Sequence, residues 1–367
     1  MGIEFKFLKA GNGDSIYIST DNGINILIDG GWTYTYDKAI KPIVKNIRKN
    51  NQKLDLVILT HYDNDHIMGL YKLLVEENKK GSDTIIKEVW FNAFEKAIFE
   101  PLKKNNESKQ SGAKKQKQFE EVIEKIKKHI YYHDHISINQ IKEPIEKDDI
   151  VVLSPYTDKS YKSTKEIIIT LLSPNDEKIK ELKEEYEIEM KKSGIKQEDW
   201  DKNIKDLLTN PEYLDEEEAN GSSIAFILEY KGKKFLLLGD AHIDLITDSL
   251  RALGYTKENP LEVEFIKLSH HGSKGNISND FLSLVKSKEF RILANSKTTH
   301  KHPDKETMVK IISHYRDIYP SVEFIFTYEI EEVFGDIELF KEEDLIENNL
   351  VLIQTSKRMK FCYQGEI

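Results

Sequence analysis

Hydrophobic residues near the N-terminus occur in short runs separated by polar turns. The runs "IEFKFL", "SIYIST" and "INILIDGG" are rich in β-branched and aromatic residues, and Gly, Asn and Asp stand between them. This pattern predicts three strands. A helical spacing of apolar residues follows over 36–50, and the run "LDLVILT" at 54–60 predicts the next strand.

The same alternation returns in the C-terminal half. Residues 222–241 predict two strands joined by a turn at 231–233, and residues 242–254 predict a helix capped by Gly254. Further strands and helices are expected over 263–273, 291–296, 304–319 and 322–328. Strands and helices that alternate in two such runs predict an α/β sandwich.

The two runs are separated by a stretch of different composition. The segment "PLKKNNESKQSGAKKQK" carries six lysines and one glutamate, and "DEKIKELKEEYEIEMKKSG" is a strongly charged helical segment. Charge runs of this kind usually form solvated helix faces. We therefore expect one domain over 1–367, with a charged, mostly helical insertion region at 99–218 that also contains the strands "DIVVLSP" and "EIIITLLSP".

Composition narrows the class of protein. A net charge of −10 is no general signature of nucleic-acid binding, although an acidic protein can hold a local basic groove. The single cysteine, Cys362, excludes an intrachain disulfide and a thiolate metal cluster, which fits a reducing compartment. The sequence has neither a signal peptide nor an apolar run of eighteen residues, so we expect a cytoplasmic protein that does not bind membranes.

Three polar clusters each follow an apolar strand directly: "VILTHYDNDH", "FLLLGD" and "FIKLSHHGS". Strand ends that meet at one edge are where open α/β sheets place their sites. The first cluster has two histidines and two aspartates within six residues, which is a dense set of metal-ligating side chains. We therefore predict a metal site at this edge.

The spacing suggests how the ligands divide. His61 and Asp63 are two residues apart, so on an extended segment their side chains point the same way. Asp65 and His66 lie where the chain turns into a helix and face a second ion. Asp240 offers a carboxylate that can bridge two cations, and an imidazole comes from one of two neighbouring histidines, His271 or His270. Two ions about 4 Å apart would hold a hydroxide and clamp the oxygens of an in-line displacement.

With these motifs in order, the sequence resembles the metallo-β-lactamase superfamily, and within it the hydrolase domain of ComEC, the bacterial DNA-uptake channel protein. The subgroup's HxDxDH motif corresponds to residues 61–66. The resemblance extends to "GNGDSIYI", "ILIDGG", "NGSSIAFIL", "LSHHGSKGNIS" and "HKHPDKET", and it covers roughly two thirds of the chain. It implies a four-layer αββα sandwich with charged helical insertions, a one- or two-metal centre and phosphodiester hydrolysis by a metal-bound hydroxide.

The resemblance also implies roles for individual residues. Asp29 would orient a ligand, His61 and Asp63 would hold the first metal, and Asp65 and His66 would hold the second. Further roles fall to the bridging ligand Asp240, the last ligand His271 with His270 as its rival, the catalytic residues Asp65 and His302, and the phosphate-contacting residues Asn220, Ser273 and Lys274.

The sequence departs from the wider superfamily at two points. Asp63 replaces a histidine, which makes the first site harder and favours Mn²⁺ or Mg²⁺ over Zn²⁺ there. No histidine clearly matches the ligand that normally lies between His66 and Asp240; we interpret His133 and His135 as solvated or core residues. We therefore expect one or two divalent ions, Mn²⁺ or Zn²⁺ ahead of Mg²⁺.

We predict a metal-dependent phosphodiesterase that acts on DNA, in bacterial DNA processing or in antiviral defence against foreign DNA. RNA and cyclic nucleotides are the other nucleic-acid substrates to consider. Two alternatives stay open: a hydrolase of small substrates (a cyclic or short-oligonucleotide phosphodiesterase, or a lactonase), and a subunit active only with a partner protein bound to the charged insertion. The basic run at 103–117 would contact a nucleic-acid backbone in a salt-sensitive way.

Two loop segments have competing interpretations. We expect Asn12, Gly13 and Asp14 to form a structural turn between strands. Trp32, Tyr34 and Tyr36 follow Asp29, and either stack on bases or sugars or cover the core. The positions of the three aromatic side chains decide between stacking on a ligand and packing on the core.

Overall fold

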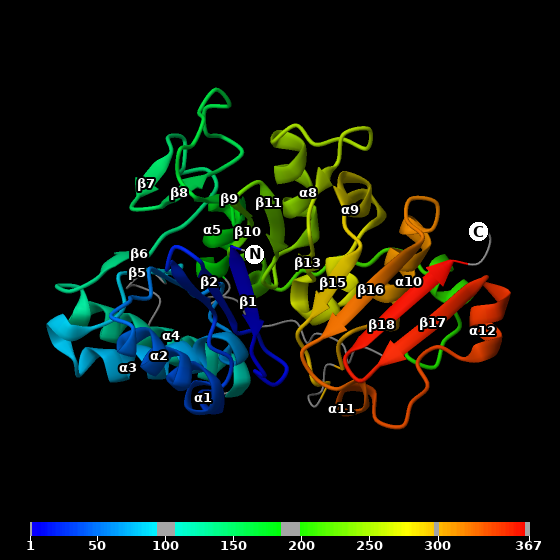
Figure 1. The fold of residues 1–367 in the computed structure, drawn as a ribbon, viewed down its shortest axis with the longest axis horizontal. Helices are drawn as coiled ribbons and strands as arrows, with labels where there is room; N and C mark the ends of the chain where they lie inside the picture. The colour runs from blue at the N-terminus through cyan, green and yellow to red at the C-terminus, as the bar shows by residue number, and fades with distance from the viewer. Residues whose placement is uncertain (1, 94–106, 185–198, 297–300, 364–367) are drawn as a thin grey trace.

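The computed structural model describes residues 2–93, 107–184, 199–296 and 301–363. Its framework consists of two β-sheets packed face to face, with helices on both outer faces (Figure 1). This is the four-layer αββα sandwich, and it confirms the predicted fold class.

The first sheet has six strands in the order β1-β2-β3-β4-β5-β6. Its first three strands are antiparallel, whereas β3 to β6 run parallel. Helices connect the parallel strands, as βαβ crossovers require. The strands are β1 (Ile3–Phe7), β2 (Ile16–Thr20), β3 (Asn25–Ile28), β4 (Leu56–Ile58), β5 (Glu88–Trp90) and β6 (Tyr131–His133).

The second sheet has ten strands in the order β17-β18-β16-β15-β13-β11-β10-β9-β8-β7. Its centre, β11-β13-β15-β16, is parallel, so the C-terminal ends of these strands lie at one edge. The strands are β7 (Ile145–Lys147), β8 (Ile150–Leu153), β9 (Ile167–Ser173), β10 (Ala225–Tyr230), β11 (Lys233–Leu237), β13 (Ile266–Lys267), β15 (Glu289–Ile292), β16 (Ser321–Phe326), β17 (Leu350–Thr355) and β18 (Arg358–Tyr363). A separate pair joins β12 (Leu261–Glu262) and β14 (Val285–Lys286).

Three apolar cores separate the four layers. The central core lies between the sheets and joins residues such as Ile18 and Ile58 of the first sheet to Ile169 and Phe226 of the second. A second core packs the first sheet against its helices, and a third packs the second sheet against the helices on its other side. Strands buried on both faces are expected to be apolar, as β4 is throughout and β3 is from Ile26 to Ile28.

The first sheet is covered by a π-helical turn η1 (Tyr36–Ile40) together with α2 (Lys41–Lys49), α3 (Asn64–Asn78) and α4 (Glu107–Ile126). The second sheet is covered by α6 (Ile204–Thr209), α8 (Ile243–Ala252), α9 (Asn279–Leu284), α10 (Lys305–Tyr315) and α11 (Ile330–Phe334). The remaining helices are α1 (Thr33–Thr35), α5 (Asp176–Glu184), α7 (Glu218–Gly221) and α12 (Glu342–Glu347), with a 3-10 turn η2 (Gly81–Asp83).

The charge-rich region at 99–218 contributes to these layers. Helix α4 buries Phe119, Val122 and Ile123 against the first sheet, and β8 and β9 extend the second. The start of the basic run, Lys103 and Lys104, lies outside the described residues, as does most of the second charged segment. The division into one domain with an insertion stays a prediction.

In the part of the chain that the structure describes, no helix is both long and apolar enough to span a bilayer.

Candidate metal centre

The predicted ligands stand at the C-terminal ends of strands from both sheets. His61 lies three residues after β4, and α3 begins at once with Asp65 and His66 in its first turn. Asp240 follows β11, and His271 lies in the 3-10 turn η5 (Ser269–Gly272) after β13. Both sheets therefore deliver polar side chains to the same edge of the sandwich.

The carboxylate of Asp240 lies between three imidazoles. Its Oδ2 is 3.3 Å from Nε2 of His271, 3.4 Å from Nε2 of His66 and 4.0 Å from Nε2 of His61. All four side chains are buried. Three imidazole nitrogens around one carboxylate oxygen are a donor set suited to a divalent cation.

The hydrogen bonding agrees with a bound cation. Among the described residues, Nε2 of His61, Nε2 of His66 and Oδ1 of Asp240 are buried atoms without a hydrogen-bond partner. Buried polar atoms are rarely left in this state, because each costs about 1–3 kcal/mol. Four overlapping groups have ligand atoms that all lie within 4.8 Å of one another: His61-His66-Asp240, Asp65-His66-His271, Asp14-Asp240-His271 and Asp14-Asp29-His66. The residues present thus fit one or two metal ions.

Asp29 fixes the orientation of His66. Its Oδ2 lies 2.9 Å from Nδ1 of His66 and accepts a 2.7 Å hydrogen bond from the hydroxyl of Thr60, while its Oδ1 accepts from the Thr60 backbone N–H at 2.8 Å. A carboxylate on Nδ1 sets the imidazole tautomer that leaves Nε2 as the ligand atom. Asp29 therefore lies where an orienting residue belongs.

Two further residues of the site were not predicted as such. We interpreted Asp14 as part of a structural turn, but it is fully buried beside the cluster, and its Oδ1 lies 3.3 Å from Nδ1 of His271. Lys267 is also buried; its ammonium pairs with Asp14 and lies 3.6 Å from Asp240. The visible signal was a lysine inside the apolar run "FIKL".

Electrostatics favour charged forms of these groups. Burial alone would lower the pKa values of His66 and His271, but the charge of Asp240 raises both, that of His271 to about 10. Burial raises the pKa of Asp240, and the charges of His271 and His66 reverse this and bring it well below its usual value. The site thus stabilises a negative carboxylate at Asp240, and a metal cation can take the place of the histidine protons that compensate it.

The two aspartates of the first cluster lie at the more open side of the site. Asp63 Oδ2 is 3.7 Å from Nε2 of His61, and Asp65 Oδ2 is 3.9 Å from Nε2 of His271. Their side chains are 42% and 17% exposed, so the approach to the centre lies on this side. Asp65 also accepts a 2.6 Å hydrogen bond from Nδ2 of Asn12.

The two neighbouring histidines point in different directions. His271 faces Asp240, whereas Nδ1 of His270 lies 3.0 Å from Oδ2 of Asp215 and 3.3 Å from Nδ2 of Asn220. His270 belongs to none of the ligand groups found among the described residues. The geometry therefore favours His271 as the ligand.

Backbone conformation explains how adjacent residues diverge so sharply. His270 and His271 have φ values of 45° and 56°, in the left-handed region that non-glycine residues seldom adopt. Asp29 is also left-handed, with φ 54°. Such residues cost of order 1–3 kcal/mol each and cluster at functional sites.

The predicted phosphate contacts border the cluster. Asn220 is buried and donates a 2.8 Å hydrogen bond to Asp215. Ser273 caps the 3-10 turn η6 (Lys274–Asn276), and the Lys274 backbone N–H donates to Asp304. Asn220 and Ser273 therefore shape the loops around the site.

His302 lies beside His270, with ring centroids 5.0 Å apart. Its Nδ1 is 3.5 Å from Oδ2 of Asp304. Burial lowers the pKa of His302 to about 4, so its ring is neutral at neutral pH. The histidine pair His133 and His135 lies elsewhere. His133 is 3.2 Å from Glu88, and His135 is 3.7 Å from Asp176.

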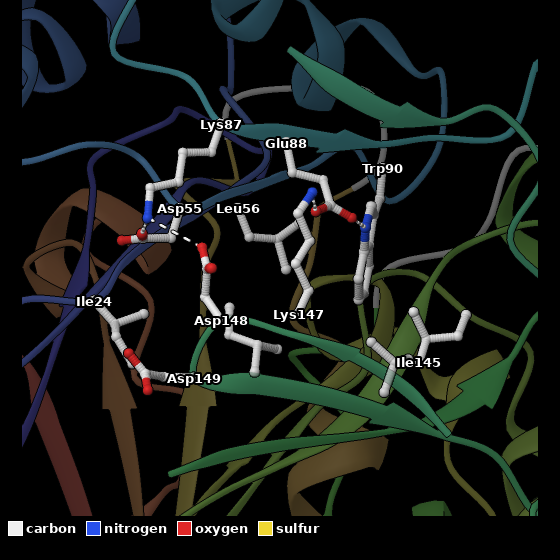
Figure 2. Close-up of a pocket in the computed structure, with 12 residues that line it drawn as sticks. Ile24, Asp55, Leu56, Lys87, Glu88, Trp90, Ile145, Lys147, Asp148 and Asp149 are labelled. Carbon is white, nitrogen blue, oxygen red and sulfur yellow. Dashed lines mark hydrogen bonds and ion pairs between the residues drawn. The ribbon is translucent and has the colours of Figure 1, made fainter. Parts of the chain in front are cut away.

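A cleft lies at the opposite end of β4 from His61 (Figure 2). It is lined by Asp55 and Leu56 of the β4 segment, by Glu88 of β5 and by Lys147 of the β7–β8 hairpin. Glu88 is held there by Lys147 and by a 2.7 Å hydrogen bond from the Trp90 indole. This cleft lies between the two sheets, and none of the predicted metal ligands lines it.

Comparison with known proteins agrees with this geometry. The family model described as the metallo-beta-lactamase superfamily matches residues 8–148. This part of the chain is similar to that superfamily. The match includes Asp29 and the His61–His66 cluster, and the fold brings Asp240 and His271 to them from beyond it.

Individual relatives are distant. ComE operon protein 3 of Bacillus subtilis (strain 168) is 26% identical over 147 residues, which are 38% of this chain and 18% of that protein. The chain therefore matches less than a fifth of that relative's length.

Solved structures with similarity include YhfI from Bacillus subtilis (10% identity, 80% of this chain and 87% of that chain, TM-score 0.36). Zn²⁺-bound PqqB from Methylobacterium extorquens (10%, 86% and 96%, TM-score 0.38) and the short form of human tRNase Z (13%, 72% and 76%, TM-score 0.30) are further examples.

Proposed function

We propose that this protein is a divalent-metal-dependent phosphodiester hydrolase that acts on DNA. The observation that carries the proposal is the Asp240 carboxylate, held within 4.0 Å of the Nε2 atoms of three buried histidines. The similarity to ComE operon protein 3 and the resemblance of the HxDxDH motif to ComEC-like hydrolases support the phosphodiester class.

The chain's own residues have distinct roles in this proposal. His61, His66, His271 and Asp240 hold the metal, and Asp63 and Asp65 complete its open side. A bound ion supplies Lewis-acid activation of the phosphodiester and of the attacking water. The imidazole nitrogens favour Mn²⁺ or Zn²⁺ over Mg²⁺, even though aspartate oxygens stand among them.

Other residues bind and orient the substrate. Asp29 keeps His66 in its ligand tautomer, and Lys274 offers a cation for the charge that develops on phosphorus oxygens. His302 carries a ring N–H at the edge of the site, and an anionic phosphate beside it would raise its pKa and favour proton donation to the leaving oxygen.

A hydrolase of small substrates is the second candidate. His61, His66, Asp240 and His271 are each no more than 4% exposed, which suits a cyclic or short-oligonucleotide diester, or a lactone, that enters the site whole. DNA would have to reach the centre from the side of Asp63 and Asp65.

The test is cleavage of labelled linear and circular DNA, single- and double-stranded, with Mn²⁺, Mg²⁺ or Zn²⁺. Asp240→Asn is the inactivating variant, and Asp244→Asn is its matched control because Asp244 is an exposed aspartate at the start of α8. Metal-dependent cutting by the wild type and the control, but not by Asp240→Asn, is the expected result.

Failure to cut with every metal would contradict an autonomous DNA nuclease. Short-oligonucleotide and cyclic diesters would then test the second candidate, and co-purification would test for a protein that activates the site through the charged region at 99–218.

A further inference from the structure

An aromatic loop lies beside the metal centre and has no part in the roles given above. Trp32 and Tyr34 follow β3 by a few residues, directly after Asp29 and two glycines. The indole Nε1 of Trp32 donates a 3.0 Å hydrogen bond to Oδ1 of Asn12, and Nδ2 of Asn12 donates a 2.6 Å bond to Asp65. Two hydrogen bonds therefore connect Trp32 to a carboxylate of the site.

Both rings pack over the same glycine. A Cβ on Gly11 would lie 2.4 Å from Oη of Tyr34 and 3.1 Å from Cδ1 of Trp32, and φ at Gly11 is +81°. The backbone N–H of Gly11 donates a 2.6 Å bond to the hydroxyl of Tyr328, which is itself bonded to Tyr34. The loop is thus held from two sides, and its rings have a fixed position.

Their exposure separates these rings from core aromatics. Tyr34 is 43% exposed and Trp32 is partly exposed, whereas Tyr36, two residues on, is 3% exposed and packs in the core between the first sheet and its helices. Lys38 places its ammonium 5.9 Å from the centre of the Tyr34 ring. Tyr36 therefore has the structural role that the sequence left open for all three, and the other two rings remain available to a ligand.

We propose that Trp32, Tyr34 and Lys38 form a subsite for an unpaired nucleobase next to the scissile phosphate, an inference that rests on the proposed phosphodiesterase function. Fixed aromatic rings beside a cation are how proteins hold single-stranded nucleic acids, since every base offers a flat face for stacking. The Asn12 link to Asp65 sets the distance from this base to the metal centre. The subsite therefore selects single-stranded or frayed ends over intact duplex.

The test compares two esters with the same leaving group, thymidine 5′-(p-nitrophenyl) phosphate and methyl p-nitrophenyl phosphate. Only the first has a base. Tyr34→Ala should raise KM for the thymidine ester by roughly 5- to 100-fold, the usual effect of removing one stacking partner, and should leave the methyl ester unchanged. Tyr34→Phe keeps the ring and should restore the wild-type KM.

A binding measurement gives an answer that does not depend on catalysis. A short oligothymidylate with one 2-aminopurine should lose fluorescence on stacking with the wild-type protein, and Tyr34→Ala should abolish the quenching. Tyr156→Ala is the matched control, because Tyr156 is 51% exposed but follows β8, which lies three strands from β11 in the second sheet.

The outcomes separate the two proposals. Quenching that is lost only in Tyr34→Ala supports the subsite, whether or not the esters are hydrolysed. Absence of hydrolysis of both esters would contradict the hydrolase proposal alone. If Tyr34→Ala behaves like Tyr156→Ala in both measurements, or the wild type shows no quenching, the subsite does not exist.

Discussion

The burial of Asp240 among other carboxylates costs free energy of folding. Its carboxylate is buried with those of Asp14 and Asp29, and burying charges is unfavourable unless opposite charges compensate. Lys267 supplies one compensating charge, to Asp14 and Asp240. The histidines add positive charge only when they are protonated. In the unprotonated form that metal ligation needs, they add none. A metal cation would complete the balance.

Replacing Lys267 tests this balance. Lys267→Met leaves Asp14 and Asp240 without their buried cation, so we expect the free energy of unfolding to fall by about 3–5 kcal/mol without added metal. Added Mn²⁺ should recover part of the loss, because the ion restores positive charge. Urea unfolding with and without Mn²⁺ measures both effects. Lys233→Met, at an exposed ion pair on β11, should cost less than about 1 kcal/mol.

Replacing Asp29 tests the orientation of His66. Asp29→Asn keeps the size of the side chain but weakens the acceptor on Nδ1, so metal affinity should fall about 10- to 100-fold. Isothermal titration of the metal-free protein with Mn²⁺ or Zn²⁺ gives the change. Equal affinities in Asp29→Asn and the wild type would remove Asp29 from the site.

Single site residues were predictable where a residue type that ligates metals directly follows an apolar strand. His61, His66 and Asp240 follow apolar strands, so strand order alone brings them to one edge. The choice between His270 and His271 was not predictable, because it depends on left-handed backbone angles. Asp14 and Lys267 were missed because they join the site through contacts with one another, with His271 and with Asp240, across sequence separations that no local pattern reveals.

At the scale of elements, close backbone contact holds the site together. Helix α3 carries Asp65 and His66 and packs against the turn after β3 that carries Asp29. The Gly69 N–H donates a 2.9 Å bond to the Gly31 carbonyl, and a Cβ on Gly69 would lie 1.9 Å from the Gly30 carbonyl oxygen. Only glycine at Gly69 permits this approach.

Gly69→Ala should therefore move α3 away from β3. We expect a loss of stability of about 1–3 kcal/mol, the usual cost of forcing an extra carbon into a packed contact, together with weaker metal binding because His66 moves with the helix. Urea unfolding and metal titration measure the two. Gly81→Ala separates packing from backbone strain. A Cβ there would meet no atom within 4 Å, but φ at Gly81 is +56°, so any loss of stability reflects the left-handed backbone alone and metal binding should stay unchanged.

The periodicity of hydrophobic residues predicted most helices and strands, because their apolar faces pack against the sheets. The expected helix over 304–319 corresponds to α10, and the strand run at 222–241 corresponds to β10 and β11. The hairpin of β17 and β18 was not predicted. Val351 and Ile353 are apolar yet 39% and 52% exposed, so the run lacks the alternation that marks a half-buried strand.

At the scale of the whole molecule, the two sheets are joined by charge as well as by the central core. Glu88 of β5 accepts hydrogen bonds from Trp90 and from Lys147 of β7 (Figure 2). It also lies 3.2 Å from His133. Burial alone would raise the pKa of Glu88, but His133, Lys147 and Trp90 lower it to about 2. The carboxylate therefore stabilises the folded state in its charged form.

A lowered pKa makes this stabilisation depend on pH. It is fully present above the ordinary glutamate pKa of about 4.5 and is lost as the pH falls toward about 2. We expect this group to contribute about 3 kcal/mol to the loss. In Glu88→Gln that part of the acid dependence should disappear, as urea unfolding between pH 6 and pH 2.5 would show. Glu143→Gln, at an exposed glutamate, should keep the wild-type profile.

The central claim is that the edge shared by the two sheets holds a divalent metal at Asp240. Equilibrium dialysis against Mn²⁺ or Zn²⁺, followed by elemental analysis of the protein, tests it most directly. We predict one or two ions per wild-type chain and per Asp244→Asn chain, and a clear loss in Asp240→Asn. A wild-type protein that retains no ion, or an Asp240→Asn variant that retains as many as the wild type, would contradict the account.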